Sequence, residues 1–417
     1  MEQLEMNKNL SEQIGIESKP KITKYQWKTL WASTIGYAMD GLDMMILAYT
    51  LPLIMAFYGL NQAEGGALST ITLLGSVLGG IFFGTLADKF GRVKVFSWTI
   101  LIFSVFTGLC AVAPNEQAFA FFRFMAGLGL GGEFGIGMTI VSESWHKKYR
   151  SRATSIVAVG FQFGTVLATL AVLFIAPEFG WQGVFLAGVL PSLLAFWSRK
   201  NLEEPEIWKV LKKENKNKIA IGQLFSSAKQ TKTTIGLIIA TTVQNFGFYG
   251  IMTWMPTMLA TEMGYSFNKT TVWTVVTIIG MIIGIITFGI LADKIGRRPS
   301  YIIYLFSAAT IVWIYFHQTS TTILLLLGGV LGFFVNGMMG GYGALLAEHY
   351  STEARSTAEN VIFNIGRGFA GFAPWIIGYL SLNYSLSFAL GLISLTYIIS
   401  ALSFIFLIPE TKGTELK

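Results

Sequence analysis

The sequence predicts an all-α integral membrane protein with twelve transmembrane helices in two pseudo-symmetric six-helix bundles. Composition, apolar segment length and an internal repeat lead to this prediction. Of the 417 residues, 53% are hydrophobic and 13% are charged, whereas a typical soluble protein is roughly 45–50% apolar and about 25% charged. So little charge cannot cover the surface of a soluble protein of this size. Disordered, coiled-coil and disulfide-scaffold classes are excluded as well.

Apolar stretches along the chain are long enough to cross a bilayer, which takes about 20 helical residues. The predicted spans are 27–57, 66–87, 94–114, 117–143, 153–176, 181–201, 232–259, 270–292, 299–317, 321–346, 357–380 and 384–408. The most polar interval separates six spans from six. The expected domains are therefore an N-terminal tail (1–26), a first bundle (27–201), a linker (202–231), a second bundle (232–408) and a C-terminal tail (409–417).

Basic residues are distributed very unevenly across the predicted topology. If the N-terminus is inside, 27 of the 30 lysines and arginines fall in cytoplasmic segments. The positive-inside rule then predicts a multi-pass cell-membrane protein with both termini cytoplasmic. The net charge of +7 reflects orientation, so nucleic-acid binding is not expected. A single cysteine, Cys110, excludes an intramolecular disulfide, and the three scattered histidines suggest no metal site. No cofactor is expected.

The two halves of the chain share an internal repeat. Residues 84–94 read GTLADKFGRVK and residues 289–299 read GILADKIGRRP, an offset of 205 residues. The same offset relates Glu143 to Glu348 and Arg150 to Arg355. Matching inner loops imply a pseudo-twofold axis along the membrane normal, as in secondary transporters whose substrate site lies between the halves.

With this duplicated loop, the sequence resembles the major facilitator superfamily across essentially all twelve spans. The resemblance implies alternating access by rocking of two helical bundles, with charged loop networks that close the cytoplasmic side. Carried over, Asp88, Arg92, Glu143 and Arg150 would form one network, and Asp293, Arg297, Glu348 and Arg355 the other. The second loop has Arg298 where the first has Val93, so we expect the first network to be weaker.

Five charged residues lie in the interior of predicted spans, away from the span ends: Asp40, Asp43, Arg123, Glu133 and Arg367. Charge in a bilayer is costly and indicates function by default. Asp40 and Asp43 are three residues apart, on one helical face, and burial of two nearby carboxyls favours proton uptake by one of them. We predict that they carry or gate a proton, with Glu133 as a further candidate. The alternative for either Asp is a fixed structural pair with Arg123, and for Glu133 a hydrogen bond to a neighbouring helix.

The two arginines are candidate receptors for an anion. Arg123 can hold a substrate carboxylate or neutralise Asp40 or Asp43. Arg367 lacks a partner in the centre of its own half, so a carboxylate bound there would bridge the bundles. Its alternative partner is Glu359, which lies nearer the inner end of the same span. The glycines of RFMAGLGLGGEFG, spaced by four, predict close helix packing rather than a phosphate loop.

Further polar residues are expected to line a central cavity, although each alone is more often an interhelical hydrogen bond. They are Gln162, Gln244, Asn245, Tyr249, Asn336 and Asn364.

Within the superfamily, the Asp-Gly-x-Asp pattern and the segment GGEFGIGMTIVSESW resemble the organic-acid:proton symporters of the aromatic-acid and sialate/lactate groups. Arg123, Arg355 and Arg367 match positions of functional arginines in the aromatic-acid group. This resemblance implies a secondary active transporter, not an enzyme, that imports an aromatic acid, a lactate-like acid, a sialate or nicotinate with protons. Its partners would be this small organic anion, protons and the lipid bilayer, and it would act as a monomer.

A sugar:proton symporter is the main alternative. Sugar porters carry paired glutamines and two tyrosines in the seventh span, whereas this chain has Gln244-Asn245 and the single Tyr249. A drug efflux antiporter and a non-transporting sensor are further alternatives. The antiporters carry a Gly-Pro-rich fifth span, and span 153–176 contains no proline.

Overall fold

The computed structural model describes residues 22–60, 62–199, 202–213, 221–264, 267–381 and 383–416. Within these residues, ten helices are long and apolar enough to cross a membrane. One of the ten belongs to α7 (Arg150–Arg199), which turns back at Gly180 with φ of 62° and so forms two limbs. Together with α2 (Lys24–Tyr58), the chain has the twelve membrane-crossing segments of the predicted fold. Most of the predicted N-terminal tail and residues 214–220 of the linker lie outside the described residues.

The first half of the chain forms one bundle. Between α2 and α7 it contains α3 (Gln62–Phe90), α4 (Arg92–Cys110), α5 (Glu116–Leu130) and α6 (Glu133–Ser144). The helices α5 and α6 together correspond to the predicted span 117–143. The two limbs of α7 correspond to spans 153–176 and 181–201, which the sequence suggested as separate helices.

The second half forms the other bundle, after a linker that contains α8 (Glu206–Lys213) and η1 (Ile221–Phe225). Its elements are α9 (Ala228–Thr261), α10 (Phe267–Ile295), α11 (Arg297–Phe316), α12 (Thr321–Gly337), η2 (Met338–Gly341), α13 (Tyr342–His349), α14 (Arg355–Ala370), α15 (Ala373–Ser381), α16 (Leu386–Gly391) and α17 (Ile393–Phe406).

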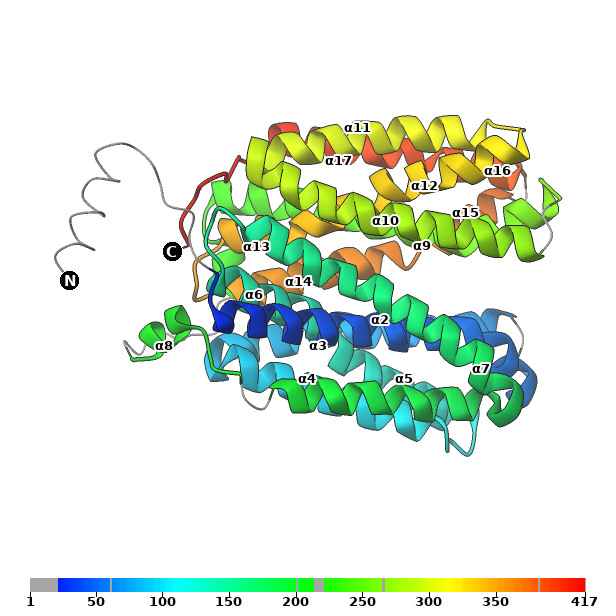
Figure 1. The fold of residues 1–417 in the computed structure, drawn as a ribbon, viewed down its shortest axis with the longest axis horizontal. Helices are drawn as coiled ribbons and strands as arrows, with labels where there is room; N and C mark the ends of the chain where they lie inside the picture. Colours follow the sequence, from blue (N-terminus) through cyan, green and yellow to red (C-terminus); the bar gives the residue numbers. More distant parts are fainter. Residues whose placement is uncertain are drawn as a thin grey trace.

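The two bundles lie side by side with their helices roughly parallel (Figure 1). The start of α2, the linker helix α8 and the C-terminus all lie at one end of the molecule, on the left in Figure 1. We call this the linker end. It also carries Gly91 and Gly296, the positive-φ glycines of the two repeated loops. The opposite end is called the far end.

Two pseudo-equivalent helices are broken near the middle of the bundles. The break between α5 and α6 falls at Gly131 and Gly132, and η2 separates α12 from α13 over Met338–Gly341. Irregular backbone at membrane depth is tolerated only where protein or a cavity surrounds it. All the residues of both breaks are buried, so the breaks place backbone and side chains at the interface of the bundles.

The predicted glycine strip packs against other helices, as its spacing suggested. A Cβ built on Gly127 would lie 2.1 Å from the carbonyl oxygen of Thr72 on α3, and one on Gly131 would lie 2.1 Å from that of Ser76. Gly135 meets Asn360 of the opposite bundle instead. The strip therefore serves two interfaces, one within the first bundle and one between the bundles.

Gly127→Ala is expected to destabilise the protein by about 1–3 kcal/mol, the usual cost of overpacking, although alanine is the better helix former. The nearest atom is backbone, which cannot move without shifting α3. The matched control is Gly222→Ala, because a Cβ there meets nothing within 4 Å. Thermal unfolding of the purified protein measures both changes. A Gly127→Ala protein as stable as the control would contradict this packing.

Candidate functional site

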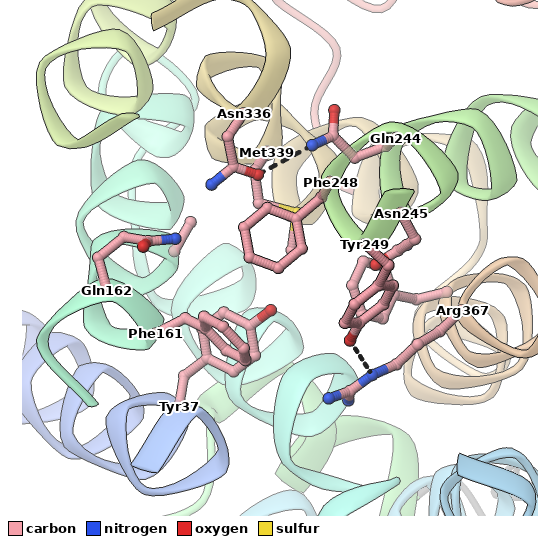
Figure 2. A pocket seen from close by; sticks show the side chains of 12 residues that line it. Tyr37, Phe161, Gln162, Gln244, Asn245, Phe248, Tyr249, Asn336, Met339 and Arg367 are labelled. Carbon is pink, nitrogen blue, oxygen red and sulfur yellow. Dashed lines mark hydrogen bonds between the residues drawn. The ribbon is translucent and has the colours of Figure 1, made fainter. Parts of the chain in front are cut away.

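A small cavity lies between the bundles, near the helix breaks (Figure 2). Its walls come from α2 and α7 of the first bundle and from α9, α12, η2 and α14 of the second. The cavity volume is about 30 Å³, which is room for one or two water molecules. An organic molecule can enter only if the bundles move apart, so the structure shows the site in a contracted state.

Arg367 of α14 enters this cavity and joins the two bundles. Its Nη1 and Nη2 donate to Asp40 Oδ2 and Oδ1 of α2 at 3.2 and 3.3 Å. Its Nε donates to the hydroxyl of Tyr249 at 3.0 Å (Figure 2). Asp40 and Arg367 are both buried. The sequence suggested Glu359 as the alternative partner of Arg367, but the structure pairs Arg367 with Asp40.

Asp43 forms the second buried ion pair of α2, and this pair stays inside the first bundle. Arg123 of α5 donates to both oxygens of Asp43, at 2.9 and 3.2 Å. The hydroxyl of Thr107 also donates to Asp43, and Arg123 Nε donates to Thr72 at 3.3 Å. Neither Asp43 nor Arg123 lines the cavity. The single sequence pattern DGLD therefore supplies one pair between the bundles and one within a bundle.

Glu133 occupies the first turn of α6 and is buried. Its Oε1 lies 2.5 Å from the hydroxyl of Thr99 on α4. Both residues belong to the first bundle and neither lines the cavity. This geometry corresponds to the hydrogen bond between neighbouring helices that was the structural alternative for Glu133.

Most of the polar residues expected at the site do line the cavity. Gln244 Nε2 donates to Asn336 Oδ1 at 3.0 Å (Figure 2), and Gln162, Asn245 and Tyr249 complete the polar part of the wall. Asn364 differs. Its Nδ2 donates to the carbonyl oxygens of Gly131 and Asn360 at 2.8 and 2.9 Å, so it fastens the bundles together outside the cavity.

The sequence reasoning missed the apolar wall. Tyr37, Phe161, Phe248, Met339 and Phe363 line the cavity opposite and between the amides. The ring centroid of Tyr37 lies 5.4 Å from that of Phe161. Tyr37 precedes Asp40 by three residues and therefore lies on the same helix face. This spacing could have predicted from the sequence that Tyr37 lies near the site. The other four could not be distinguished from ordinary core residues.

At the linker end, the first charged network crosses from one bundle to the other. Arg92 contacts Asp88 at 3.1 Å and Glu143 at 3.3 Å, and Arg355 of the second bundle donates to Glu143 at 2.7 Å. Asp88 also accepts from the backbone N–H and the hydroxyl of Thr357 at 2.8 and 2.6 Å. Asp88 thus caps the start of α14, a helix whose own N-cap residue makes no side-chain cap.

The second network is the symmetry mate of the first. Arg297 contacts Asp293 at 3.3 Å and Glu348 at 2.8 Å, and Arg150 of the first bundle donates to Glu348 at 2.7 Å. Asp293 accepts from the backbone N–H of Arg152 at the start of α7. The grouping therefore differs from the expected one, since Arg150 and Arg355 each belong to the network of the opposite half. Arg150 at the start of α7 and Arg355 at the start of α14 each extend across the interface and pair with a glutamate of the other bundle.

Val93 does not weaken the first network in the way expected. Arg298, its counterpart, donates to the carbonyl oxygens of Phe404 and Ile405 at 2.9 and 2.5 Å and forms no ion pair with any acid in the described part of the chain. Arg298, the residue that corresponds to Val93 in the second half, is thus not part of the charged network there. Each network contains two acids and two buried arginines, and the second also includes the half-exposed Arg152, whose Nε lies 3.4 Å from Asp293.

The family model of the Major Facilitator Superfamily matches residues 33–286 and 237–417. This chain belongs to the major facilitator superfamily. It is a multi-pass membrane transport protein and not an enzyme. Among the described residues, no cluster of three or more histidine, cysteine or acidic side chains could hold a metal ion.

Two of the relatives are named for transport of an organic acid. The chain is 47% identical over 403 residues (95% of this chain, 99% of the relative) to a Haemophilus influenzae protein named only for metabolite transport. It is 31% identical to the cis,cis-muconate transport protein of Acinetobacter baylyi (91% and 94% covered). It is 30% identical to the sialic acid transporter NanX of Escherichia coli (89% and 91% covered).

Among solved structures, the proton:xylose symporter XylE matches with a TM-score of 0.79 at 19% identity. The match covers 94% of this chain and 98% of that one. At this identity the likeness shows the fold: twelve helices in two bundles.

The crossed networks predict which side chains are energetically coupled. In a double-mutant cycle on thermal stability, Arg150→Met and Glu348→Gln should show strong coupling. Arg150→Met and Glu143→Gln should be nearly additive. Removing one member of a buried pair costs about 3–5 kcal/mol. Removing Glu348 should cost less in the Arg150→Met protein than in the parent, because only its pair with Arg297 is then left to break. Equal coupling in the two cycles would argue against the crossing.

Proposed function

We propose that this transporter imports a small organic carboxylate together with protons by alternating access. The observation that supports this most strongly is the ion pair between Arg367, which lines the central cavity, and Asp40, which lies behind Arg367 and does not itself line the cavity. An arginine side chain presents a planar pair of N–H donors that matches the two oxygens of a carboxylate. In this structure Arg367 donates in this way to the carboxylate of Asp40. A substrate acid of the same chemistry can replace Asp40 on Arg367.

Replacement of Asp40 requires that its charge be removed, and this is how we propose that proton and substrate are coupled. Arg367 and Asp40 are both buried, so a displaced, ionised Asp40 would remain as an unpaired charge, which is strongly unfavourable. A proton taken up by Asp40 removes that cost and leaves Arg367 free for the substrate. The two binding events therefore favour each other.

The remaining lining supports an acid with an unsaturated or ring-shaped body. Tyr37, Phe161, Phe248 and Phe363 offer aromatic faces, and the amides of Gln162 and Gln244 offer polar contacts at the rim of these faces. The muconate and sialate carried by relatives fit this chemistry in general terms. We propose an aromatic acid, a lactate-like acid, a sialate or nicotinate as the substrate.

We further propose the roles of the other buried charges. Asp43, held by Arg123, and Glu133 are candidates for a second proton step. The linker end is cytoplasmic by the positive-inside rule, so the closed networks there belong to a state that does not face the cytoplasm. One chain contains the whole cavity, so a monomer suffices, and the proton is the only coupling species required.

Sugar:proton symport is a second candidate, favoured by one specific observation. Four amide side chains, Gln162, Gln244, Asn245 and Asn336, line the cavity, and amides are suited to sugar hydroxyls. Counterflow exchange in proteoliposomes separates the candidates. We expect labelled organic acids to exchange and sugars such as xylose to exchange no faster than in empty liposomes. Exchange of sugars alone would replace the proposal, and no exchange of any solute would indicate a sensor.

Asp40→Asn should uncouple transport from the proton gradient. The amide cannot ionise, so acid binding should lose its dependence on pH, and uphill accumulation should fall to the level of the external concentration. Substrate-driven proton uptake into proteoliposomes measures the coupling directly. If Asp40→Asn accumulated substrate as the parent does at every pH, Asp40 would not be the coupling residue.

Arg367→Ala should weaken binding of every carboxylate by at least about tenfold, because hydrogen bonds to a charged group contribute about 1.5–3 kcal/mol each and 1.4 kcal/mol is tenfold. Binding of uncharged analogues should change much less. Arg298→Ala is the control, since it removes an arginine from the linker end. Unchanged affinity for all acids in Arg367→Ala would place the substrate carboxylate elsewhere.

A further inference from the structure

Glu359 is a buried acid that none of the roles above uses. It lies on α14, eight residues before Arg367, and therefore about 12 Å nearer the linker end. Its Oε2 lies 2.5 Å from the hydroxyl of Thr139 on α6, a helix of the opposite bundle. Glu359 has no exposed surface. It thus sits between the central cavity and the first charged network, directly on the interface that must open.

The surroundings of Glu359 suit a neutral carboxyl group better than a carboxylate. The nearby charges are Arg355 on its own helix, Glu143 on α6 and Asp88 on α3. Arg355 already donates to Glu143 at 2.7 Å, and the other two are acids. Oε1 of Glu359 is buried without a hydrogen-bond partner among the described residues. An unpartnered oxygen costs far more in an ion than in a neutral acid.

The hydrogen-bond count around Thr139 points the same way. Its hydroxyl lies 2.9 Å from the carbonyl oxygen of Gly135 as well as 2.5 Å from Glu359. A threonine hydroxyl has one proton to donate, and a carbonyl oxygen only accepts. Both bonds form together when Thr139 donates to Gly135 and a protonated Glu359 donates to Thr139.

The pseudo-symmetric position shows that closure by itself does not require an acid. With the offset of 205 residues, Glu359 corresponds to Thr154 at the same turn of α7. The hydroxyls of Thr154 and of the adjacent Ser155 lie 3.3 and 3.0 Å from the carbonyl oxygen of Gly340 across the interface. The Thr154 hydroxyl also lies 3.2 and 3.1 Å from the carbonyl oxygens of Arg150 and Ser151 on its own helix. The second interface thus closes with a hydroxyl where the first uses a group that can ionise.

We propose that Glu359 is a separate proton-binding site that controls opening of the linker end. Its proton is bound while the bundles are closed there. When the bundles part, the bond to Thr139 breaks and water reaches Glu359, which releases the proton to that side. Closing requires the proton to return from the same side, so it is not carried across the membrane. This proposal needs alternating access alone and does not depend on the substrate or on coupling through Asp40.

The consequence is a specific dependence of conformation on pH. Protonation favours the closed form, because only the neutral group is buried without cost. The closed fraction at the linker end should fall as pH rises through the range in which Glu359 titrates. In Glu359→Gln, the amide is always neutral and can still donate to Thr139, so closure should persist at high pH.

The experiment measures the distance between spin labels at Lys89→Cys and Lys294→Cys, one on each bundle at the linker end, in a Cys110→Ala background. Substrate-free full-length protein in lipid nanodiscs is titrated with pH. The parent should shift to longer distances as pH rises, and Glu359→Gln should stay at the short distance over the same range. Glu116→Gln, the same exchange at the far end, should behave as the parent.

Two results would overturn the proposal. One is a parent distance that does not change with pH, and the other is Glu359→Gln opening over the same pH range as the parent. Glu359→Thr, which copies Thr154, provides a second neutral variant should the glutamine variant not fold. Infrared difference spectra supply an independent measurement. One carbonyl band of a protonated carboxyl should disappear in the parent at high pH and be missing in Glu359→Gln, and an unchanged set of bands in Glu359→Gln would also contradict the assignment.

Discussion

A charge buried within a membrane protein must have a partner, and the arrangement of this transporter depends on that constraint. Transferring an arginine into hydrocarbon is costly, so buried arginines pair with acids or with backbone carbonyls. Arg92, Arg123, Arg297, Arg355 and Arg367 are all buried, and each is within ion-pair distance of an acid. Where the pair lies within one bundle it fixes structure. Where the pair joins two bundles, it must break before the bundles can separate.

The pairs between the bundles are arranged by depth. The networks of Arg355 with Glu143 and of Arg150 with Glu348 close the linker end, and the bond of Glu359 to Thr139 lies deeper. The pair of Arg367 with Asp40 lies farthest from the linker end, where Arg367 lines the cavity. The helix α14 carries a member of three of these four contacts. This single helix therefore links the contacts at the linker end with the pair at the cavity.

The twofold pseudo-symmetry explains why the arginines cross. Two bundles related by an axis along the membrane normal meet through equivalent surfaces, so a contact from Arg150 to Glu348 implies one from Arg355 to Glu143. The exceptions are informative for the same reason. Among the charged residues that join the bundles near the cavity, Asp40, Arg367 and Glu359 have no charged counterpart at the offset of 205 residues, and these are the positions to which we assign proton or substrate binding.

The sequence by itself determined the membrane fold, the duplicated halves and which charged residues lie within the spans, because charge is so scarce in apolar spans that each instance stands out. It also placed Gln162, Gln244, Asn245, Tyr249 and Asn336 at a cavity. Only the tertiary structure decided the partners. From the sequence, Arg367 could pair with Glu359 or bind a substrate, and only the packing of the bundles placed Asp40 beside it. Likewise, the sequence left open whether Arg150 and Arg355 join the charged network of their own half or of the opposite half. The aromatic wall and the setting of Glu359 were also decided by the tertiary structure. A sequence shows which groups need a partner, but contacts between helices hundreds of residues apart depend on how the two bundles are docked.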